Sequence, residues 1–212
     1  DFNIKNLCLA GGVALNCVAN GKILEKKLFK NLWIQPAAGD AGGALGAALG
    51  YWYQELNQKR SVNNDDDAMK GSYLGPQFSN EEVEAKLNLL RANYIKYDND
   101  DELISTISKK INQKQIVGWF QGRMEFGPRA LGARSILADP RDEEMQKKLN
   151  LKIKFREGFR PFAPSIISEK KEDWFDLYQE SPYMLLVAKV KSDHTFKMTD
   201  EQKKLFGIEK LN

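Results

Sequence analysis

The sequence has few side chains suited to covalent or metal chemistry. Cys8 and Cys17 are the only cysteines, and His194 is the only histidine among 212 residues. The cysteines lack CxxC or zinc-ligand spacing and lie among apolar neighbours, a pattern typical of buried, reduced thiols. No GxSxG motif accompanies the single histidine, which disfavours a Ser-His-Asp system, so we expect His194 at the surface.

Long apolar runs and a large charge excess are also absent. No stretch approaches the roughly 20 apolar residues of a membrane span, and no signal-peptide pattern follows Asp1. The 32 basic and 29 acidic side chains leave a net charge of +3, too small to indicate general affinity for nucleic acid or membranes. We therefore expect a cytoplasmic protein. Because the chain has no initiator Met and starts just before a strand pattern, we expect a fragment of a larger protein.

The first 57 residues have the pattern of an α/β fold. Strands are predicted at residues 5–10 and 32–35, and helices at residues 15–28 and 43–56. Residues 57–70 then become polar and acidic, with too few apolar positions for a packed face. This change predicts an interdomain linker at residues 58–72.

Residues 73–212 are expected to form a second domain of mixed helices and strands. Ser79 and Glu82 have capping-box spacing before a helix. Asp139 can cap another helix with Pro140 at its first position, and its inward positions would be Met145, Leu149 and Ile153. Further helices are predicted at residues 102–112 and 171–178, and strands at residues 116–120 and 183–190.

The excess positive charge is concentrated between Gly122 and Ser165. This stretch has ten Lys or Arg against six Asp or Glu. Its cations alternate with Gly, Pro and Phe, so the backbone can approach a ligand closely while guanidinium groups form paired bonds to phosphate. We predict an anion site, whose candidate residues are Arg123, Arg129, Arg134, Ser135, Lys154, Arg156 and Arg160.

Two alternatives remain open for these cations. The arginines can be surface ion-pair partners of the nearby Glu125, Asp139 and Glu157, because exposed pairs are common. An RNA-binding loop is the other alternative, although the aromatic residues do not form an RRM signature.

Two glycine turns near the start of the chain precede predicted helices. The first contains Gly11, Gly12 and Asn16, and the second contains Asp40, Gly42 and Gly43. Free N–H groups at helix starts can accept the phosphates of a nucleotide, but glycine turns also serve close packing. Neither a Walker A nor a GxGxxG motif is present. Asp40 can be a helix N-cap or a ligand of a hard metal ion.

Five segments together resemble the nodulation-type and antibiotic-tailoring O-carbamoyltransferases: GGVALN, QPAAGDAGGALGAAL, YLGPQFSNEEVEAKL, GRMEFGPRALGARSILADPR and KFREGFRPFAPS. The resemblance spans residues 7–183 and is most specific at GPRALGxRSIL and RPFAP. It implies that residues 1–57 end a kinase-like domain of actin/Hsp70 type. Residues 73–212 would form a threonylcarbamoyl-adenylate-synthase-like domain, incomplete at its C-terminus.

The resemblance also implies a reaction. In such enzymes the C-terminal domain makes carbamoyl adenylate from carbamoyl phosphate and ATP, and the kinase-like domain passes the carbamoyl group to a hydroxyl of a small molecule or saccharide. Matching motifs assign Arg129 and Lys154 to catalysis and place Arg123, Arg134, Ser135, Arg156 and Arg160 in the same pocket. The alternative is an RNA-binding or threonylcarbamoyl-adenylate-synthase-like module without O-carbamoyl transfer.

The kinase-like part implies further ligands. Gly11, Gly12, Asn16, Gly42 and Gly43 match its nucleotide-binding segments, and Asp40 matches its last metal-binding aspartate. Mg2+ is expected with ATP, and Fe2+ or another divalent metal in the kinase-like domain, with histidine ligands upstream of Asp1. We expect neither membrane nor nucleic-acid partners, and a homodimer is a candidate assembly. The fragment alone is expected to be inactive in full transfer.

Overall fold

The computed structural model describes residues 4–62 and 67–205, which combine helices with small sheets in an α+β arrangement. The chain divides into two compact units. The first contains Asp1–Lys96, Gly118–Ser135 and Glu180–Val187, and the second contains Tyr97–Val117, Ile136–Gln179 and Ala188–Asn212. The linker at residues 58–72 stays a prediction, and most of its acidic run, residues 63–66, lies outside the described residues.

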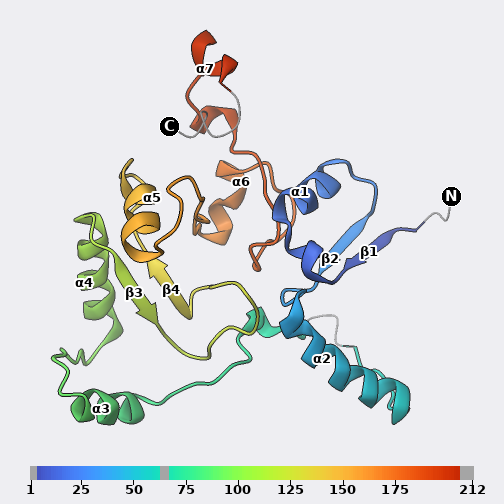
Figure 1. Cartoon of the computed structure of the whole chain (residues 1–212), viewed down its shortest axis with the longest axis horizontal. Helices are drawn as coiled ribbons and strands as arrows, with labels where there is room; N and C mark the ends of the chain where they lie inside the picture. Colours follow the sequence, from blue (N-terminus) through green and yellow to red (C-terminus); the bar gives the residue numbers. More distant parts are fainter. Residues whose placement is uncertain (1–3, 63–66, 206–212) are drawn as a thin grey trace. The chain divides into compact units, whose positions relative to one another are not determined.

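The first unit begins with a parallel β-α-β arrangement (Figure 1). Its elements are β1 (Asn6–Leu9), a 3-10 turn (Gly12–Leu15), α1 (Cys17–Glu25), β2 (Asn31–Ile34) and α2 (Asp40–Gly50), which continues into a π-helical turn (Tyr51–Glu55). Asn6 lies opposite Asn31, and Leu9 opposite Ile34. The strands and helices predicted for this region are confirmed, with slightly different ends.

The core of the first unit joins segments that are far apart in sequence. Its buried residues are Ala14, Ile34, Ala38, Met69, Tyr183 and Leu185, and the partly buried Phe126 and Leu131 pack against them. Asn20 is only 2% exposed and donates from Nδ2 to the carbonyl oxygens of Ala14 and Leu185. The buried amide of Asn20 thus links the segments around Ala14 and Leu185 in a specific arrangement, because a buried amide without hydrogen bonds would be costly.

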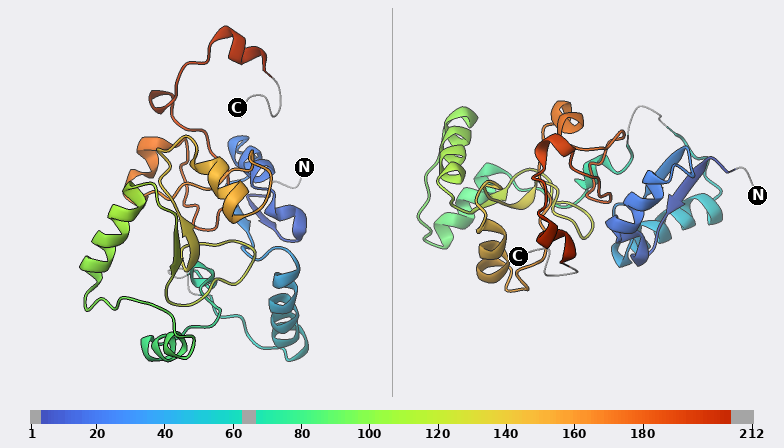
Figure 2. Two further views of the ribbon diagram at one scale, coloured as in Figure 1. Left: turned by 60° about the vertical axis from the view of Figure 1, so that its left-hand side comes forward. Right: turned by 90° about the horizontal axis from the view of Figure 1, so that it is seen from above.

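The helices of the first unit differ in how they lie relative to the strand pair β1–β2. Figure 2 shows α1 alongside β1 and β2, and α2 extending away from them. No residue of α2 is buried. Helix α3 (Asn80–Leu89) starts with the predicted capping box, in which the Ser79 hydroxyl accepts from the Glu82 N–H and the Glu82 carboxylate accepts from the Ser79 N–H.

The second unit contains mainly short helices. They are α4 (Asp100–Asn112), α5 (Met145–Lys148) with a π-helical turn (Leu149–Ile153), α6 (Lys171–Trp174) and α7 (Asp200–Lys204), with 3-10 turns at Ser168–Lys170 and Ser192–His194. Strands β3 (Val117–Phe120) and β4 (Arg134–Leu137), whose residues from Gly118 to Ser135 belong to the first unit, pair in a separate two-stranded sheet. Within the described parts of the chain, no helix is long and apolar enough to cross a lipid bilayer.

Two predictions around Asp139 are wrong. Asp139 does not cap a helix, because its carboxylate accepts from the backbone N–H and the guanidinium of Arg141, and the helix starts only at Met145. Ile153 is exposed rather than inward, since the α-helix gives way to a π-helical turn after Lys148 and the apolar spacing is lost. Met145 and Leu149 are buried as predicted.

Three further expectations need correction. Tyr183–Val190 is not a strand among the described residues, where only an isolated bridge joins Val190 to Phe175. The helix expected at residues 171–178 ends at Trp174. Cys8 is exposed, because Leu7 and Leu9 turn inward and the alternation of a strand directs Cys8 outward, and Cys17 is half-buried.

Candidate functional site

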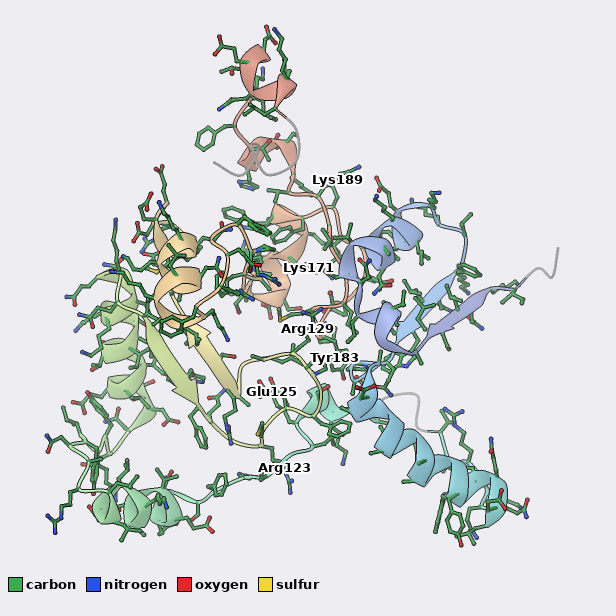
Figure 3. All side chains as sticks on the ribbon, in the orientation of Figure 1. Arg123, Glu125, Arg129, Lys171, Tyr183 and Lys189 are labelled. Carbon is green, nitrogen blue, oxygen red and sulfur yellow. The ribbon has the colours of Figure 1, made fainter. Side chains whose placement is uncertain are left out.

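The first half of the cationic stretch forms a loop between β3 and β4, residues 121–133, which we call the arginine loop. Figure 3 shows Arg123, Glu125 and Arg129 arising from it. Gly127 and Gly132 have φ values of 123° and 109°, a region that favours glycine. A Cβ atom on Gly127 would lie 3.3 Å from the Cβ of Ala37, so the loop packs closely on the segment before α2.

Glu125 holds the arginine loop from inside. Its side chain is buried, and Oε1 accepts from the backbone N–H groups of Leu131 at 2.6 Å, Ala133 at 2.8 Å and Arg134 at 3.3 Å. Burial raises the pKa of the Glu125 carboxyl, but the hydrogen bonds from backbone N–H groups outweigh this effect and leave its pKa below the ordinary value. Glu125 is therefore an ionised anchor for the loop.

Arg129 joins the arginine loop to the first glycine turn. Its Nη2 donates to the carbonyl oxygen of Leu15 at 3.1 Å, where the 3-10 turn ends. Its Nε is buried and has no hydrogen-bond partner among the described residues. The Tyr73 hydroxyl also donates to the Leu131 carbonyl oxygen at 2.5 Å, which fixes the loop close to Arg129. Two motifs that the sequence keeps far apart are thus brought together.

Arg134, Ser135 and Arg123 help to shape the arginine loop. The Arg134 guanidinium donates to the carbonyl oxygens of Gln121, Ala133 and Gly122, and its Cζ lies 3.4 Å from the centroid of the Phe120 ring. The Ser135 hydroxyl accepts from the Gly132 N–H at 3.0 Å. Arg123 donates from Nη1 to the Gly75 carbonyl oxygen at 3.0 Å. The contacts of Arg123 and Arg134 occupy guanidinium donors that the sequence analysis assigns to an anion, whereas Ser135 uses only its hydroxyl oxygen as an acceptor.

The two glycine turns differ in how much space surrounds them. Gly11 has a φ of 93°, and a Cβ atom on Gly11 or Gly12 would meet nothing within 4 Å. Asn16 caps α1 by accepting from the Ala19 N–H at 3.1 Å. A Cβ atom on Gly42 would lie 2.1 Å from the Ala37 carbonyl oxygen, whereas one on Gly43 would meet nothing. Close packing therefore requires Gly42, and open space remains beside the first turn.

Asp40 is the first residue of α2 and is exposed. The N-cap is Gly39, so the interpretation of Asp40 as a plain N-cap is wrong. The described residues contain no group of three or more His, Cys, Asp or Glu side chains that could hold a metal ion. Asp40 can supply one oxygen ligand, but it does not form a metal site by itself.

The second cationic segment, Lys154–Ser165, lies in the second unit and is organised by Asn150. Asn150 Nδ2 donates to the carbonyl oxygens of Gly158 at 3.1 Å and Arg160 at 2.8 Å, and its Oδ1 accepts from Arg156 Nε at 2.7 Å. The guanidinium of Arg156 also lies beside the Phe162 ring, with Cζ 4.9 Å from its centroid. Lys154 is exposed.

Some of the cations between Gly122 and Ser165 are ion-pair partners of nearby carboxylates, as one of the two alternatives predicts. Arg160 pairs with Glu157 at 2.7 Å, and this hydrogen bond lowers the pKa of Glu157. Asp139 pairs with Arg141, whose guanidinium lowers the pKa of that carboxyl to about 2. Glu125 instead binds backbone N–H groups, so it neutralises none of the predicted arginines through a direct hydrogen bond.

The predicted residues fall into two groups. Arg123, Arg129, Arg134 and Ser135 lie in the first unit with both glycine turns, and Lys154, Arg156 and Arg160 lie in the second. Sequence reasoning missed the anchoring roles of Glu125 and Asn150. The available signals were a carboxylate inside a glycine-punctuated loop and an asparagine next to the apolar position Leu149.

Comparison with known proteins decides the family. A family model described as Carbamoyltransferase N-terminus matches residues 1–49, and one described as Carbamoyltransferase C-terminus matches residues 108–203. The chain belongs to the carbamoyltransferase family. The resemblance found in the motifs is thereby confirmed, including the match to the C-terminal portion of these proteins.

Related proteins of this carbamoyltransferase family come from distant organisms. An uncharacterized protein of Synechocystis sp. is 58% identical over 214 residues, covering 100% of this chain and 34% of the relative. The nodulation protein NolNO of Sinorhizobium fredii is 42% identical over 89% of this chain and 27% of the relative. An uncharacterized protein of Methanocaldococcus jannaschii is 39% identical over 91% of this chain and 31% of the relative. The chain thus spans about a third of the length of such relatives.

Proposed function

We propose that this chain is part of an ATP-dependent O-carbamoyltransferase. The longer protein would form carbamoyl adenylate from carbamoyl phosphate and ATP, releasing phosphate and pyrophosphate with consumption of water. It would then transfer the carbamoyl group to a hydroxyl of a small molecule or saccharide. The single observation that carries this proposal is the match of both carbamoyltransferase family models in chain order.

The chemistry of the two substrates supports a role for the cations. Carbamoyl phosphate and ATP are both anions, and bringing them together requires positive charge to offset their repulsion. In the proposed enzyme Arg129 and Lys154 hold the carbamoyl and phosphate oxygens. Arg123, Arg134, Ser135, Arg156 and Arg160 are the further candidates for the same task. Guanidinium groups suit it because each can form paired, charge-assisted hydrogen bonds.

The first glycine turn supports a nucleotide role for the kinase-like part. Gly11 and Gly12 are exposed and have open space beside them, so a phosphate could approach their backbone. The metal of the kinase-like domain, Fe2+ or another divalent ion, stays a proposal to which this chain contributes Asp40 at most. Mg2+ would accompany ATP as its counter-ion.

Pyrophosphate release by the full-length protein tests the proposal. With ATP and carbamoyl phosphate supplied, Arg129→Ala and Lys154→Ala should each lower kcat/KM by about 100-fold, because each removes a charge-assisted contact to the reacting anions. Arg60→Ala and Lys152→Ala are matched controls, since both side chains are exposed and lie outside the candidate site.

Three outcomes separate the possibilities. Wild-type protein that releases no pyrophosphate would overturn the adenylate step. Unchanged turnover in both variants would overturn the assignment of Arg129 and Lys154. Salt-sensitive RNA binding without pyrophosphate release would favour the RNA-binding alternative.

A further inference from the structure

Asn150 is a fully buried polar side chain in the second unit. It has 0% exposure and lies in the π-helical turn after α5, next to the buried Leu149. A buried amide is costly unless it is hydrogen-bonded. Both ends of this one are used, because Nδ2 donates to two backbone carbonyl oxygens and Oδ1 accepts from Arg156. The orientation of the Asn150 side chain is therefore fixed by hydrogen bonds at both its amide nitrogen and its amide oxygen.

Arg156 is fixed at one edge of its guanidinium. Nε donates to Asn150 Oδ1 at 2.7 Å, and its backbone N–H donates to the Asn150 carbonyl oxygen at 3.0 Å. The aromatic ring of Phe162 lies 4.9 Å from the guanidinium carbon. The two terminal nitrogens form no hydrogen bond with any residue in the described part of the chain. A guanidinium has five N–H groups, so four remain for a ligand.

The neighbouring Arg160 is in a different situation. Its Nε and Nη2 both donate to the carboxylate of Glu157, at 2.7 Å and 3.4 Å. Its positive charge is therefore already paired within the segment. Arg156 differs from Arg160 because its orientation is fixed through Nε, while its two terminal nitrogens keep their N–H donors for a ligand.

We propose that Asn150 is a positioning residue that orients Arg156 to bind two oxygens of one phosphate group. The inference rests on the proposed function, which supplies two phosphate-bearing ligands, carbamoyl phosphate and ATP. Two parallel N–H···O bonds from the terminal nitrogens match the geometry of a phosphate edge. Asn150 itself touches no ligand and acts only through Arg156, because its side chain is buried.

Binding titrations of the full-length protein test this role. Arg156→Lys keeps the positive charge but removes both the Nε contact and the planar fork, so we expect the Kd of one ligand to rise about tenfold. Asn150→Ala should raise the same Kd by a similar factor. In the double variant Asn150→Ala/Arg156→Ala, the loss should equal that of Arg156→Ala alone, because residues that act through one contact are not additive.

The same unit offers a matched control pair. Asn112 Oδ1 accepts from Arg141 Nη2 at 2.7 Å, which repeats the asparagine–arginine contact outside the candidate site. Asn112→Ala and Arg141→Lys should leave both Kd values unchanged. If Asn150 had only a structural role, Asn150→Ala would lower the thermal midpoint without raising the Kd of one ligand selectively.

Separate titrations with carbamoyl phosphate and with ATP identify which phosphate is bound, because only one Kd should rise. Arg156→Lys with both Kd values unchanged would overturn the inference, and this variant remains informative if Asn150→Ala does not fold. Wild-type protein that binds neither compound would overturn it as well. Binding without pyrophosphate release would overturn the proposed adenylate step but leave the inference standing.

Discussion

Replacing Glu125 by glutamine removes the charge that holds the arginine loop while keeping the size of the side chain. In the native protein Oε1 accepts from Leu131, Ala133 and Arg134 N–H groups, and the side chain is 7% exposed. The amide oxygen of glutamine can take the place of Oε1. The variant therefore tests the contribution of ionisation and not the loss of packing.

The expected effect follows from the hydrogen bonds. Charge-assisted bonds are roughly twice as strong as neutral ones, and a neutral bond contributes about 1 kcal/mol. Since two of the three bonds are short, at 2.6 Å and 2.8 Å, the variant should lose about 2 kcal/mol of local stability. A tenfold change corresponds to about 1.4 kcal/mol, so opening of the loop should become about 30-fold more frequent.

Hydrogen–deuterium exchange of the peptide that covers residues 126–135 measures this opening. The amides of Leu131 and Ala133 should exchange faster in Glu125→Gln, and peptides of α4 should not change. Glu143→Gln serves as an isosteric control, because Glu143 is exposed. Unchanged exchange in the loop, or an equal increase over the whole chain, would refute the idea that the carboxylate is a local anchor.

The pH dependence has a defined sign. Because hydrogen bonding holds the folded-state pKa of Glu125 below its ordinary value of 4.5, its contribution is complete above that value and is lost as pH falls through the folded-state pKa. Exchange of wild type and Glu125→Gln, compared at the same pH, should therefore differ most near neutrality and converge in acid. A difference that grows on acidification would contradict this assignment.

Two further predictions concern the packing of Gly42 and the buried carboxylate of Asp139. Gly42→Ala should lower the free energy of unfolding by about 1–3 kcal/mol, and with it the thermal midpoint, because the new Cβ would lie 2.1 Å from the Ala37 carbonyl oxygen. Gly43→Ala should keep or raise the thermal midpoint, because its Cβ would meet nothing within 4 Å. The Asp139 carboxyl should titrate near pH 2 by NMR, since the guanidinium and backbone N–H of Arg141 favour its charged form, and Arg141→Gln should move the midpoint toward 3.8. Its contribution to stability is then present above 3.8 and lost as pH falls toward 2.

Local elements of this chain could be predicted because their signals lie within a few residues. The capping box of Ser79 and Glu82 involves groups three positions apart, and the strands on either side of α1 follow from short apolar patterns. The helix around Met145 shows the limit of such signals. A capping residue and a following proline predict its start at Asp139, but the Asp139 carboxylate instead accepts hydrogen bonds from the Arg141 guanidinium.

Long-range arrangement could not be predicted in the same way. Tyr183 donates to the Asp67 carboxylate and accepts from the Gly71 N–H, although more than 100 positions separate them in sequence. Burial is the main cause of its raised pKa. The apolar pattern at residues 183–190 predicts a strand, but Tyr183 and Leu185 are buried individually in the core of the first unit.

The number of positive charges in a segment does not by itself define an anion site, because the hydrogen-bond donors of those charges must also be unused. An arginine binds a ligand only with donors that the fold has not already used. Arg134 gives donors to three carbonyl oxygens, and Arg160 is paired with a carboxylate. Positive charge on these residues still adds to the local field, but their geometry serves the loops. In the proposed site, recognition of phosphate depends on the arginines with unused donors, and the second unit offers Arg156 with its terminal nitrogens unused.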